Sequence, residues 1–599
     1  MPPTRIRALY TALIGAALAV ALGACSARRY GAAADREVSR LITTRGERVP
    51  NMDRHFTIET NAPPDLGAFP RAEAPPEFLG NQGEMERDAV LLPLVPALTL
   101  AIHHSRDFQA RKETLYLTAL DVTLVRHRHQ PNFFGNARAD YQVTTEEVRV
   151  GIDAITGQPT TVLTADAILV EEQRVSGSAS VGVNWLLATG ARLGVAFTTD
   201  FLRYLTGDPR TFSQSQVAAQ LTQPLLQGAG KLAAMEDLTQ GERSLLYGLR
   251  EFTQYRKEFA VDIASAYYGI LQNRDAARNA WADLQRSRQN AEREKAFAEE
   301  GLRPMAAVDQ LQQNVLTSET RWIETVRAYR EALDRFKIRI GLPIGTRLVL
   351  DDRELAALAI TEPGLSLDEA LSVAVQTRLD LQSRKEQVED AERRIKIAAN
   401  RLLPKVDLVA AGSISGSANS GFATPDFERY RWNAGLDVDL PFDRKAERNG
   451  YRSALIARNR ASREWDLAVD EIRLQIASDA RELEQARRNY ENAEVSVKLG
   501  DRRVEEQTLR AELGRGTTRD LLDAQADLLA ARNQRTSALV SHNLARLRFW
   551  RDMGILYLKD NGHWDNLDAS VRQVRPLSTA PTADPASPNA THVEPEITR

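Results

Sequence analysis

The feature that most constrains this chain is an internal repeat. Residues 98–113 (LTLAIHHSRDFQARKE) match residues 371–386 (LSVAVQTRLDLQSRKE) without a gap at an offset of 273, and the same offset carries Pro131 onto Pro404. Beyond Pro224 the offset falls to 217. A repeat of this length indicates one structural unit used twice. The smaller offset means that the first copy holds about 56 extra residues between Pro131 and Pro224.

The placement of proline predicts long helices. Proline inside a helix costs about 3 kcal/mol, and the chain has none over residues 225–303 or 442–575, which are rich in Ala, Leu, Glu, Arg and Gln. We expect one long helix in each window, over about residues 231–300 and 445–512. At 1.5 Å per residue they are roughly 105 and 100 Å long.

Shorter helices are expected to flank the two long ones. They cover residues 97–130, 305–339, 366–401 and 517–552. Each is about half as long as a long helix, so two stacked end to end match one of them. We therefore expect each half of the chain to form a coiled-coil-like bundle.

Strands are predicted where apolar and polar residues alternate. In residues 432–442 (WNAGLDVDLPF) the apolar set falls on one face and Asn, Gly and Asp on the other. Similar alternation occurs at 181–187, and weaker alternation at 193–199 and 406–410. Such a strand fits either a membrane barrel or a soluble sandwich. A barrel in lipid tolerates no open edge, because unpaired backbone groups there cost several kcal/mol each. A chain with few strands would therefore have to oligomerise to close one.

The N-terminus has the pattern of a lipoprotein signal. Arg5 and Arg7 precede an apolar run that ends in Leu-Gly-Ala before Cys25, which is the only cysteine of 599 residues. We interpret residues 1–24 as a signal peptide and Cys25 as a lipidation site. The alternative is an ordinary secretory peptide with an incidental cysteine. Ser26 follows where an acidic retention residue could stand, so the outer membrane is the expected destination.

Composition and motifs argue against other classes of function. The chain has 78 basic and 81 acidic residues, a net charge of −3, which gives no electrostatic case for nucleic acid. No phosphate loop, nucleophile elbow or zinc-protease motif is present in the sequence, so we expect no enzyme, no cofactor and no metal. The one histidine group lacks metal-ligand spacing and is interpreted as surface residues. It consists of His103, His104, His127 and His129.

Together these features resemble the TolC and OprM family of outer-membrane efflux proteins over about residues 90–560. The residues that carry the resemblance are QPLLQGAG at 223–230, GLP at 341–343, and LG at 513–514 followed by DLLDAQ at 520–525. The resemblance implies a homotrimer with a 12-stranded barrel in the outer membrane and a 12-helix tunnel in the periplasm. It also implies a periplasmic adaptor protein and an inner-membrane transporter as partners.

We therefore predict an α+β chain built from two TolC-like repeats, whose trimeric β-barrel continues into a long periplasmic helical barrel. The expected segments are a lipidated extended leader over 25–90, a first repeat over 91–343 and a second over 344–560. Strands are placed at about 132–226 and 404–442, and residues 561–599 form a tail. The extra residues near 136–213 leave the number of strands per chain open.

Two turns at the ends of the long helices are the candidate functional sites. Gly301 with Arg303, and Gly514 with Arg515 and Thr517, mark the points where helices reverse, so they should form the periplasmic tip and face the adaptor.

Asp520 and Asp523 follow the second turn at i and i+3, on one helix face. In a trimer they would form acidic rings, and the resemblance implies that these positions line a cation-sensitive gate. By resemblance, an arginine that pins the closed state falls at Gly516, so it is absent or replaced by Arg515 or Arg519. The alternative is that Asp520 caps the helix and Asp523 is merely solvated.

Two functions remain open at this point. The first is a passive exit duct of a tripartite efflux or type I secretion system, anchored in outer-membrane lipid. The second is a non-conducting lipoprotein whose coiled coils tether the outer membrane to a periplasmic partner. The alternating strand at 432–442 favours the first.

Overall fold

The computed structural model describes residues 27–59, 66–152, 159–161, 167–205, 211–301, 304–416, 425–513 and 515–565. The predicted signal peptide, Cys25, Arg303, Gly514 and most of the predicted tail lie outside the described residues. The chain divides into two compact units. Unit 1 comprises Met1–Thr57, Glu113–Arg250 and Gln382–Leu467, and unit 2 comprises Ile58–Lys112, Glu251–Leu381 and Ala468–Arg599.

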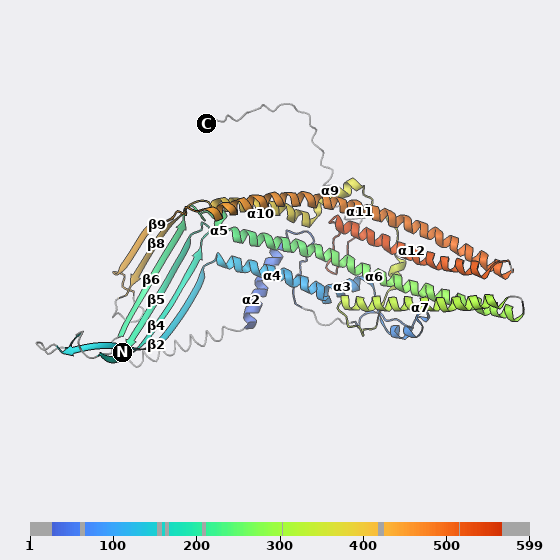
Figure 1. Ribbon diagram of the computed structural model, residues 1–599, viewed down its shortest axis with the longest axis horizontal. Helices are drawn as coiled ribbons and strands as arrows, with labels where there is room; N and C mark the ends of the chain where they lie inside the picture. Colours follow the sequence, from blue (N-terminus) through green and yellow to red (C-terminus); the bar gives the residue numbers. More distant parts are fainter. Residues whose placement is uncertain are drawn as a thin grey trace, which may run out of the picture. The chain divides into compact units, whose positions relative to one another are not determined.

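Unit 1 contains one antiparallel sheet with the strand order β3-β2-β4-β5-β6-β8-β9, and its long strands lie side by side in Figure 1. The strands are β2 (Asn132–Ile152), β3 (Pro159–Thr161), β4 (Ala167–Leu186), β5 (Arg192–Tyr204), β6 (Thr211–Pro224), β8 (Lys405–Ser415) and β9 (Tyr430–Asp439). Short β3 pairs only with Val150, Gly151 and Ile152 at the far end of β2. The six longer strands therefore form the body of the sheet.

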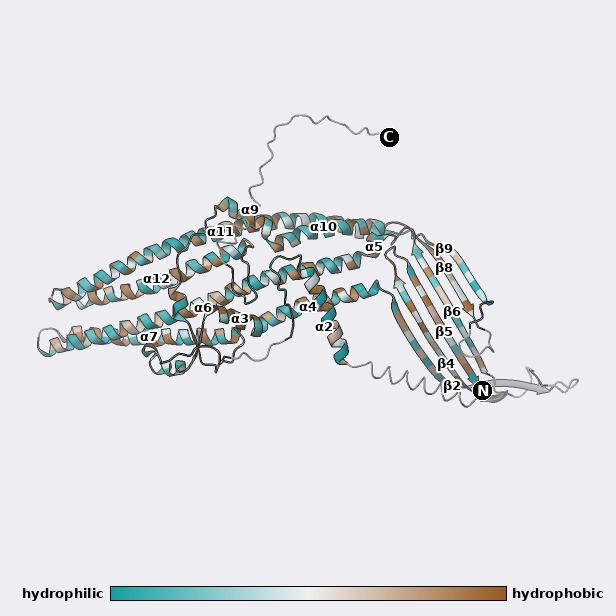
Figure 2. Ribbon diagram, turned by 180° about the vertical axis from the view of Figure 1, so that it is seen from behind, coloured by the Kyte–Doolittle hydropathy of each residue, from teal (hydrophilic) through white to brown (hydrophobic). Residues whose placement is uncertain are grey.

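The sheet has one apolar and one polar face, as the alternation along the strands in Figure 2 indicates. Register places Val183 of β4 opposite Val195 of β5, which is opposite Ala219 of β6. On β8 and β9 the same face carries the pair Leu408 and Leu436. Because successive residues of a strand point to opposite faces, the Ser, Asn, Asp and Gln residues between them form the other face.

The number of strands differs from what the family resemblance implied. Twelve strands from three copies would need four strands in each chain, and the described part of this chain has six long strands in its sheet. Four of them lie between α4 and α6, whereas two lie between α10 and α11. The extra residues of the first half therefore form additional strands of the same sheet.

The helices of unit 1 include one that the sequence analysis did not expect. The predicted extended leader contains α2 (Ala27–Gly46), a 20-residue helix. Val38, Leu41 and Ile42 of α2 are buried, and their spacing puts them on one side of a helix. The prolines after residue 49 suggested an extended segment, but they lie beyond this helix.

The first part of α6 (Glu236–Glu299) is joined to α10 (Leu379–Asn400) by ion pairs within unit 1. Arg243 Nη1 lies 2.6 Å from Asp390 Oδ1, and the Tyr247 hydroxyl donates to the same carboxylate at 2.7 Å. Asp390 is 3% exposed, so this is a buried, paired carboxylate. The other helices with residues in this unit are α4 (Arg106–Arg128), α5 (Lys231–Ala234) and part of α11 (Lys445–Glu512).

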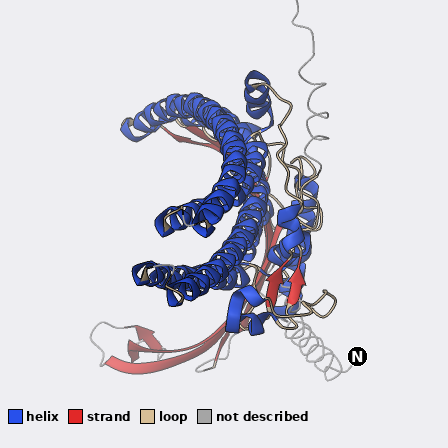
Figure 3. Cartoon of the chain, turned by 90° about the vertical axis from the view of Figure 1, so that its right-hand side faces the viewer, coloured by secondary structure: helices blue, strands red, loops and turns tan. Residues whose placement is uncertain are grey.

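Unit 2 contains two helical hairpins, formed by the second part of α6 with α7 (Met305–Arg339) and by α11 with α12 (Thr518–Asp552). Seen along the helices in Figure 3, the hairpins lie next to one another. The observed bounds of α7 and α11 coincide with the predicted ones, and α12 begins one residue later than expected. No helix in the described part of the chain is long and apolar enough to cross a membrane.

Two predicted helices are broken in unit 2. Residues 97–130 form α3 (Leu94–His104) and α4, with Ser105 extended between them, and residues 366–401 form α9 (Leu367–Thr377) and α10, with Arg378 extended. Gly341 lies against the first break and Gly554 against the second. Sequence periodicity continues across both breaks, so only these contacts reveal them.

The part of the leader that belongs to unit 2 is attached by a buried carboxylate. Glu86 ends the 3-10 helix η1 (Glu77–Glu86) and is 1% exposed. It accepts a hydrogen bond from the Tyr329 hydroxyl at 2.8 Å and pairs with Arg274 at 3.0 Å. The next segment, β1 (Val90–Leu92), pairs in parallel with β7 (Leu348–Leu350), and α8 (Asp352–Ala356) follows β7.

Candidate functional site

The turn between α6 and α7 contains the first predicted tip residue. Gly301 has φ +76°, a left-handed conformation that glycine adopts without steric cost, and its N–H donates to the Ala298 carbonyl at 3.0 Å. Pro304 then caps α7 with an extended backbone. A Cβ at Gly301 would meet no atom within 4 Å, so the turn is open to solvent.

The turn between α11 and α12 is closed by backbone hydrogen bonds to one carbonyl. The N–H groups of Arg515 and Gly516 both donate to the Arg510 carbonyl, at 2.9 and 3.1 Å. Thr517 is the N-cap of α12. The predicted tip residues Arg515 and Thr517 are exposed here.

The two predicted gate carboxylates lie in the first turns of α12, and both are exposed. Thr517 Oγ1 accepts the backbone N–H of Asp520 at 3.2 Å and donates its own proton to Asp520 Oδ2 at 2.7 Å. Thr517, not Asp520, is therefore the cap, while the Asp520 carboxylate is oriented by the cap hydroxyl. Asp523 lies one turn further along the same face.

Sequence reasoning missed the next carboxylate on this face. Asp527 follows Asp520 at i+7, and its carboxylate pairs with Arg503 of α11 at 2.5 Å. Arg532 pairs in the opposite direction with Asp501 at 2.9 Å. These two cross-helix pairs join α11 to α12.

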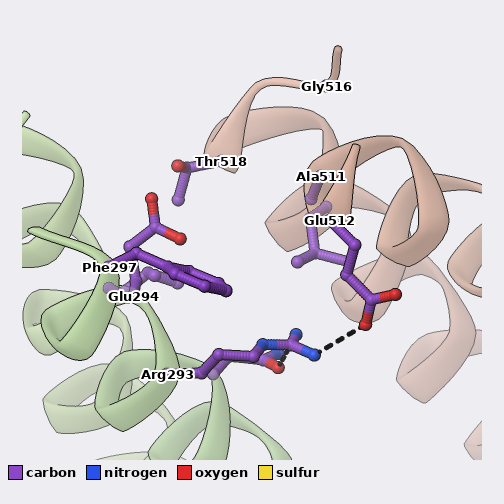
Figure 4. Close-up of a pocket in the computed structure, with 10 residues that line it drawn as sticks. Arg293, Glu294, Phe297, Ala511, Glu512, Gly516 and Thr518 are labelled. Atoms are coloured by element: carbon purple, nitrogen blue, oxygen red, sulfur yellow. Dashed lines mark hydrogen bonds and ion pairs between the residues drawn. The ribbon is translucent and has the colours of Figure 1, made fainter. Parts of the chain in front are cut away.

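A salt bridge between the two hairpins was also missed. Arg293 of α6 pairs with Glu512 at the end of α11 at 2.9 Å, as Figure 4 shows. Arg293 also donates to Asn290 at 2.9 Å. The bridge borders a small pocket whose other lining residues include Phe297, Leu311, Ala511, Gly516, Thr518 and Leu521. Arg293 and Glu512 are 219 positions apart, so no local pattern could reveal the pair.

Comparisons with known proteins agree with this architecture. Residues 370–548 match the family described as outer membrane efflux protein. No curated protein sequence matches the chain.

Several solved structures share the fold at low sequence identity. The outer-membrane channel OprN covers 84% of this chain and 98% of its own, with a TM-score of 0.54 and 12% identity. CmeC of Campylobacter jejuni covers 87% and 98%, with a TM-score of 0.54 and 12% identity. The open state of MtrE of Neisseria gonorrhoeae covers 77% and 88%, with a TM-score of 0.52 and 14% identity.

The chain has the fold of the TolC-like outer-membrane channels, a class whose members combine a β domain with long helices. The match to the outer membrane efflux protein family covers residues 370–548, and it confirms the resemblance predicted from the sequence. The family is one of outer-membrane efflux channels, in keeping with the expectation that the chain is not an enzyme.

Proposed function

We propose that this protein is the exit duct of a tripartite efflux or type I secretion system. It passively conducts solutes that a separate inner-membrane transporter and a periplasmic adaptor deliver. The observation that carries the proposal is the sheet of unit 1, which has a continuous apolar face. Within the described residues, the outward edges of β9 and of most of β2 are unpaired. Such a sheet is stable in lipid only when other copies close it into a barrel.

The proposed assembly is a homotrimer anchored at Cys25. Lipid on Cys25 would hold the N-terminus at the inner surface of the outer membrane, and α2 follows directly in the described chain. The turns around Gly301, Arg303, Gly514, Arg515 and Thr517 are the proposed adaptor-docking surface.

We place the gate at Asp520 and Asp523. Three copies would bring two carboxylates each to one constriction, where like charges repel and multivalent cations bind. Asp520 is supported for this role by its exposure and by the Thr517 hydroxyl that orients it. Asp527, the next carboxylate on the same face, is paired with Arg503 and is not part of the proposed gate.

The test is single-channel conductance in planar bilayers. We expect the Asp520→Ala/Asp523→Ala variant to conduct several-fold more than the wild type, because shorter, uncharged side chains widen the constriction. In the same variant, both the block of the channel by Mg²⁺ and the selectivity for cations should be weaker than in the wild type.

Asp309→Ala is the matched control. Asp309 is exposed in the first turns of α7, at a similar depth in the other hairpin, and its replacement should leave the conductance unchanged. Unaltered conductance and selectivity in the double variant would refute the gate assignment. A purified protein that stays monomeric and conducts nothing would favour the tether instead.

A second prediction concerns the bridge between the hairpins. Arg293 and Glu512 are 39% and 47% exposed, so breaking the pair should cost less than about 1 kcal/mol of unfolding free energy. If the gate opens by separating the hairpins, Arg293→Glu should nevertheless raise the channel's open probability, because two like charges then face each other. The double exchange Arg293→Glu/Glu512→Arg should restore the wild-type value. Equal open probability in all three proteins would exclude a role for the bridge in gating.

A further inference from the structure

The two additional strands of unit 1 have the same two-faced pattern as the rest of the sheet. Pro131 corresponds to Pro404, and these prolines precede β2 and β8. Pro224, the last residue of β6, corresponds to Pro441, which follows β9, so β4 and β5 are the additional pair. Val181 of β4 lies opposite Phe197 of β5 on the apolar face. Val181 is 59% exposed in the single chain, as a lipid-facing residue would be.

Along the middle of the additional strands, the polar face consists of small residues. On β4 it carries Ser176, Ser178, Ser180 and Gly182, and on β5 it carries Gly194, Ala196 and Thr198. Strands that lay outside a barrel wall would not need an apolar face aligned with the apolar faces of β2 and β6. The pattern is that of wall strands with lipid on one side and an open lumen on the other.

The outer edges of the sheet are suited to pairing with further copies. All ten residues of β9 are exposed, and β3 leaves residues 132–149 of β2 without a partner on its outer side within the described chain. With six long strands in antiparallel succession, β9 of one copy runs antiparallel to β2 of the next. When copies of the chain are repeated around a closed barrel, every pair of neighbouring long strands is therefore antiparallel.

We propose that three copies of this chain form an 18-stranded barrel, in which β2 of each copy pairs with β9 of its neighbour. This inference rests on the trimeric exit duct proposed above. Barrel diameter grows about linearly with strand number. The bore would thus be about 1.5 times as wide as in a 12-stranded barrel, or about 36 Å against 24 Å between backbones for 4.8 Å strand spacing and 40° tilt.

The width determines the class of cargo that can leave. At this size the β domain resembles the 16- to 18-stranded porins, which keep an aqueous channel, and the small lumen-facing residues of β4 and β5 narrow it little. The outer-membrane end would pass large hydrated solutes, such as polypeptide segments, and selection by size would occur at the helical tip.

Cysteine labelling in lipid nanodiscs tests whether β4 and β5 belong to the wall. A membrane-impermeant maleimide should label Ser178→Cys on the polar face at least ten-fold faster than Val181→Cys on the apolar face. Asp437→Cys and Leu436→Cys are the matched pair on β9, and the wild type, with Cys25 alone, gives the background. Equally fast labelling of Ser178→Cys and Val181→Cys, with Leu436→Cys protected, would place the additional strands outside the wall and overturn the proposal.

Oligomer mass and electron cryomicroscopy of the same nanodiscs separate this inference from the proposed function. A trimer with 18 wall strands supports both. A trimer with 12 wall strands overturns the wide barrel and leaves the exit duct standing. A dimer, whose two sheets would close at 12 strands, or a monomer overturns both.

Discussion

Replacing Gly341 with alanine is expected to reduce the free energy of unfolding by about 3 kcal/mol or more. Gly341 ends α7 with φ +83°, and the N–H of the next residue, Leu342, donates to the Lys337 carbonyl at 2.8 Å. This is the Schellman arrangement, which needs a left-handed residue. A Cβ at Gly341 would lie 2.1 Å from the carbonyl oxygen of His104, at the break between α3 and α4. The backbone there would have to move.

Gly301→Ala is the matched control for this prediction. Gly301 has a similar φ of +76° but no atom within 4 Å of the added methyl group. Its replacement should cost only the left-handed penalty, about 1 to 2 kcal/mol. The stability of both variants is measured by following helix content against temperature in the same detergent. Equal losses for the two would mean that contact with His104 contributes nothing.

Replacing Asp479 with asparagine is expected to stabilise the protein at pH 8 by a few kcal/mol at most. Asp479 of α11 and Asp552 of α12 are both 6% exposed. Burial, and then the neighbouring charge of Asp552, raise the pKa of Asp479 from 3.8 to about 7. Arg551 pairs with Asp552 at 2.7 and 2.8 Å, and Gln475 donates to Asp479 at 3.0 Å.

The pH dependence follows from the direction of the shift. Between pH 4 and 7 the folded chain keeps a proton on Asp479 that the unfolded chain has lost, so stability from this group is present at low pH and lost as pH rises. The stabilisation by Asp479→Asn should therefore be small near pH 4, increase up to pH 7 and then stay level.

Asp470→Asn is the control for the Asp479 variant, because Asp470 is exposed on the same helix and pairs with Arg473. It should change stability little at any pH. If the difference in unfolding free energy between the wild type and Asp479→Asn stayed constant from pH 4 to 8, the raised pKa of Asp479 would be contradicted.

Much of the helical architecture was predictable from local chemistry. The bounds of α7 and α11 follow from Pro304 before α7, Gly341 after it and the proline-free run beyond Pro441. Such signals act over a few residues, because a helix starts and stops through its own backbone hydrogen bonds. The tip turns could be located for the same reason, since glycine marks helix ends directly, whereas the gate role of Asp520 and Asp523 was implied by the family resemblance.

The strands were harder to predict. On β9 large apolar residues alternate with Asn and Asp, and this strand was recognised, whereas on β4 the polar face is Ser and Gly, which weakens the contrast. Only the pairing of Val183 with Val195 and of Phe133 with Val183 shows that β2, β4 and β5 form one sheet. The number of strands in each chain was therefore left open by the sequence and is answered by the structure.

By itself the sequence determined where the long helices run, where they reverse and where carboxylates gather at the second turn, because these properties depend on neighbouring residues. Only the tertiary structure decided which distant residues meet: the Arg293–Glu512 bridge, the Asp479–Asp552 pair and the fit of Gly341 against His104. It also decided that β4 and β5 join the sheet. These contacts depend on how separate helices and strands pack in space, and no periodicity along a single segment records that packing.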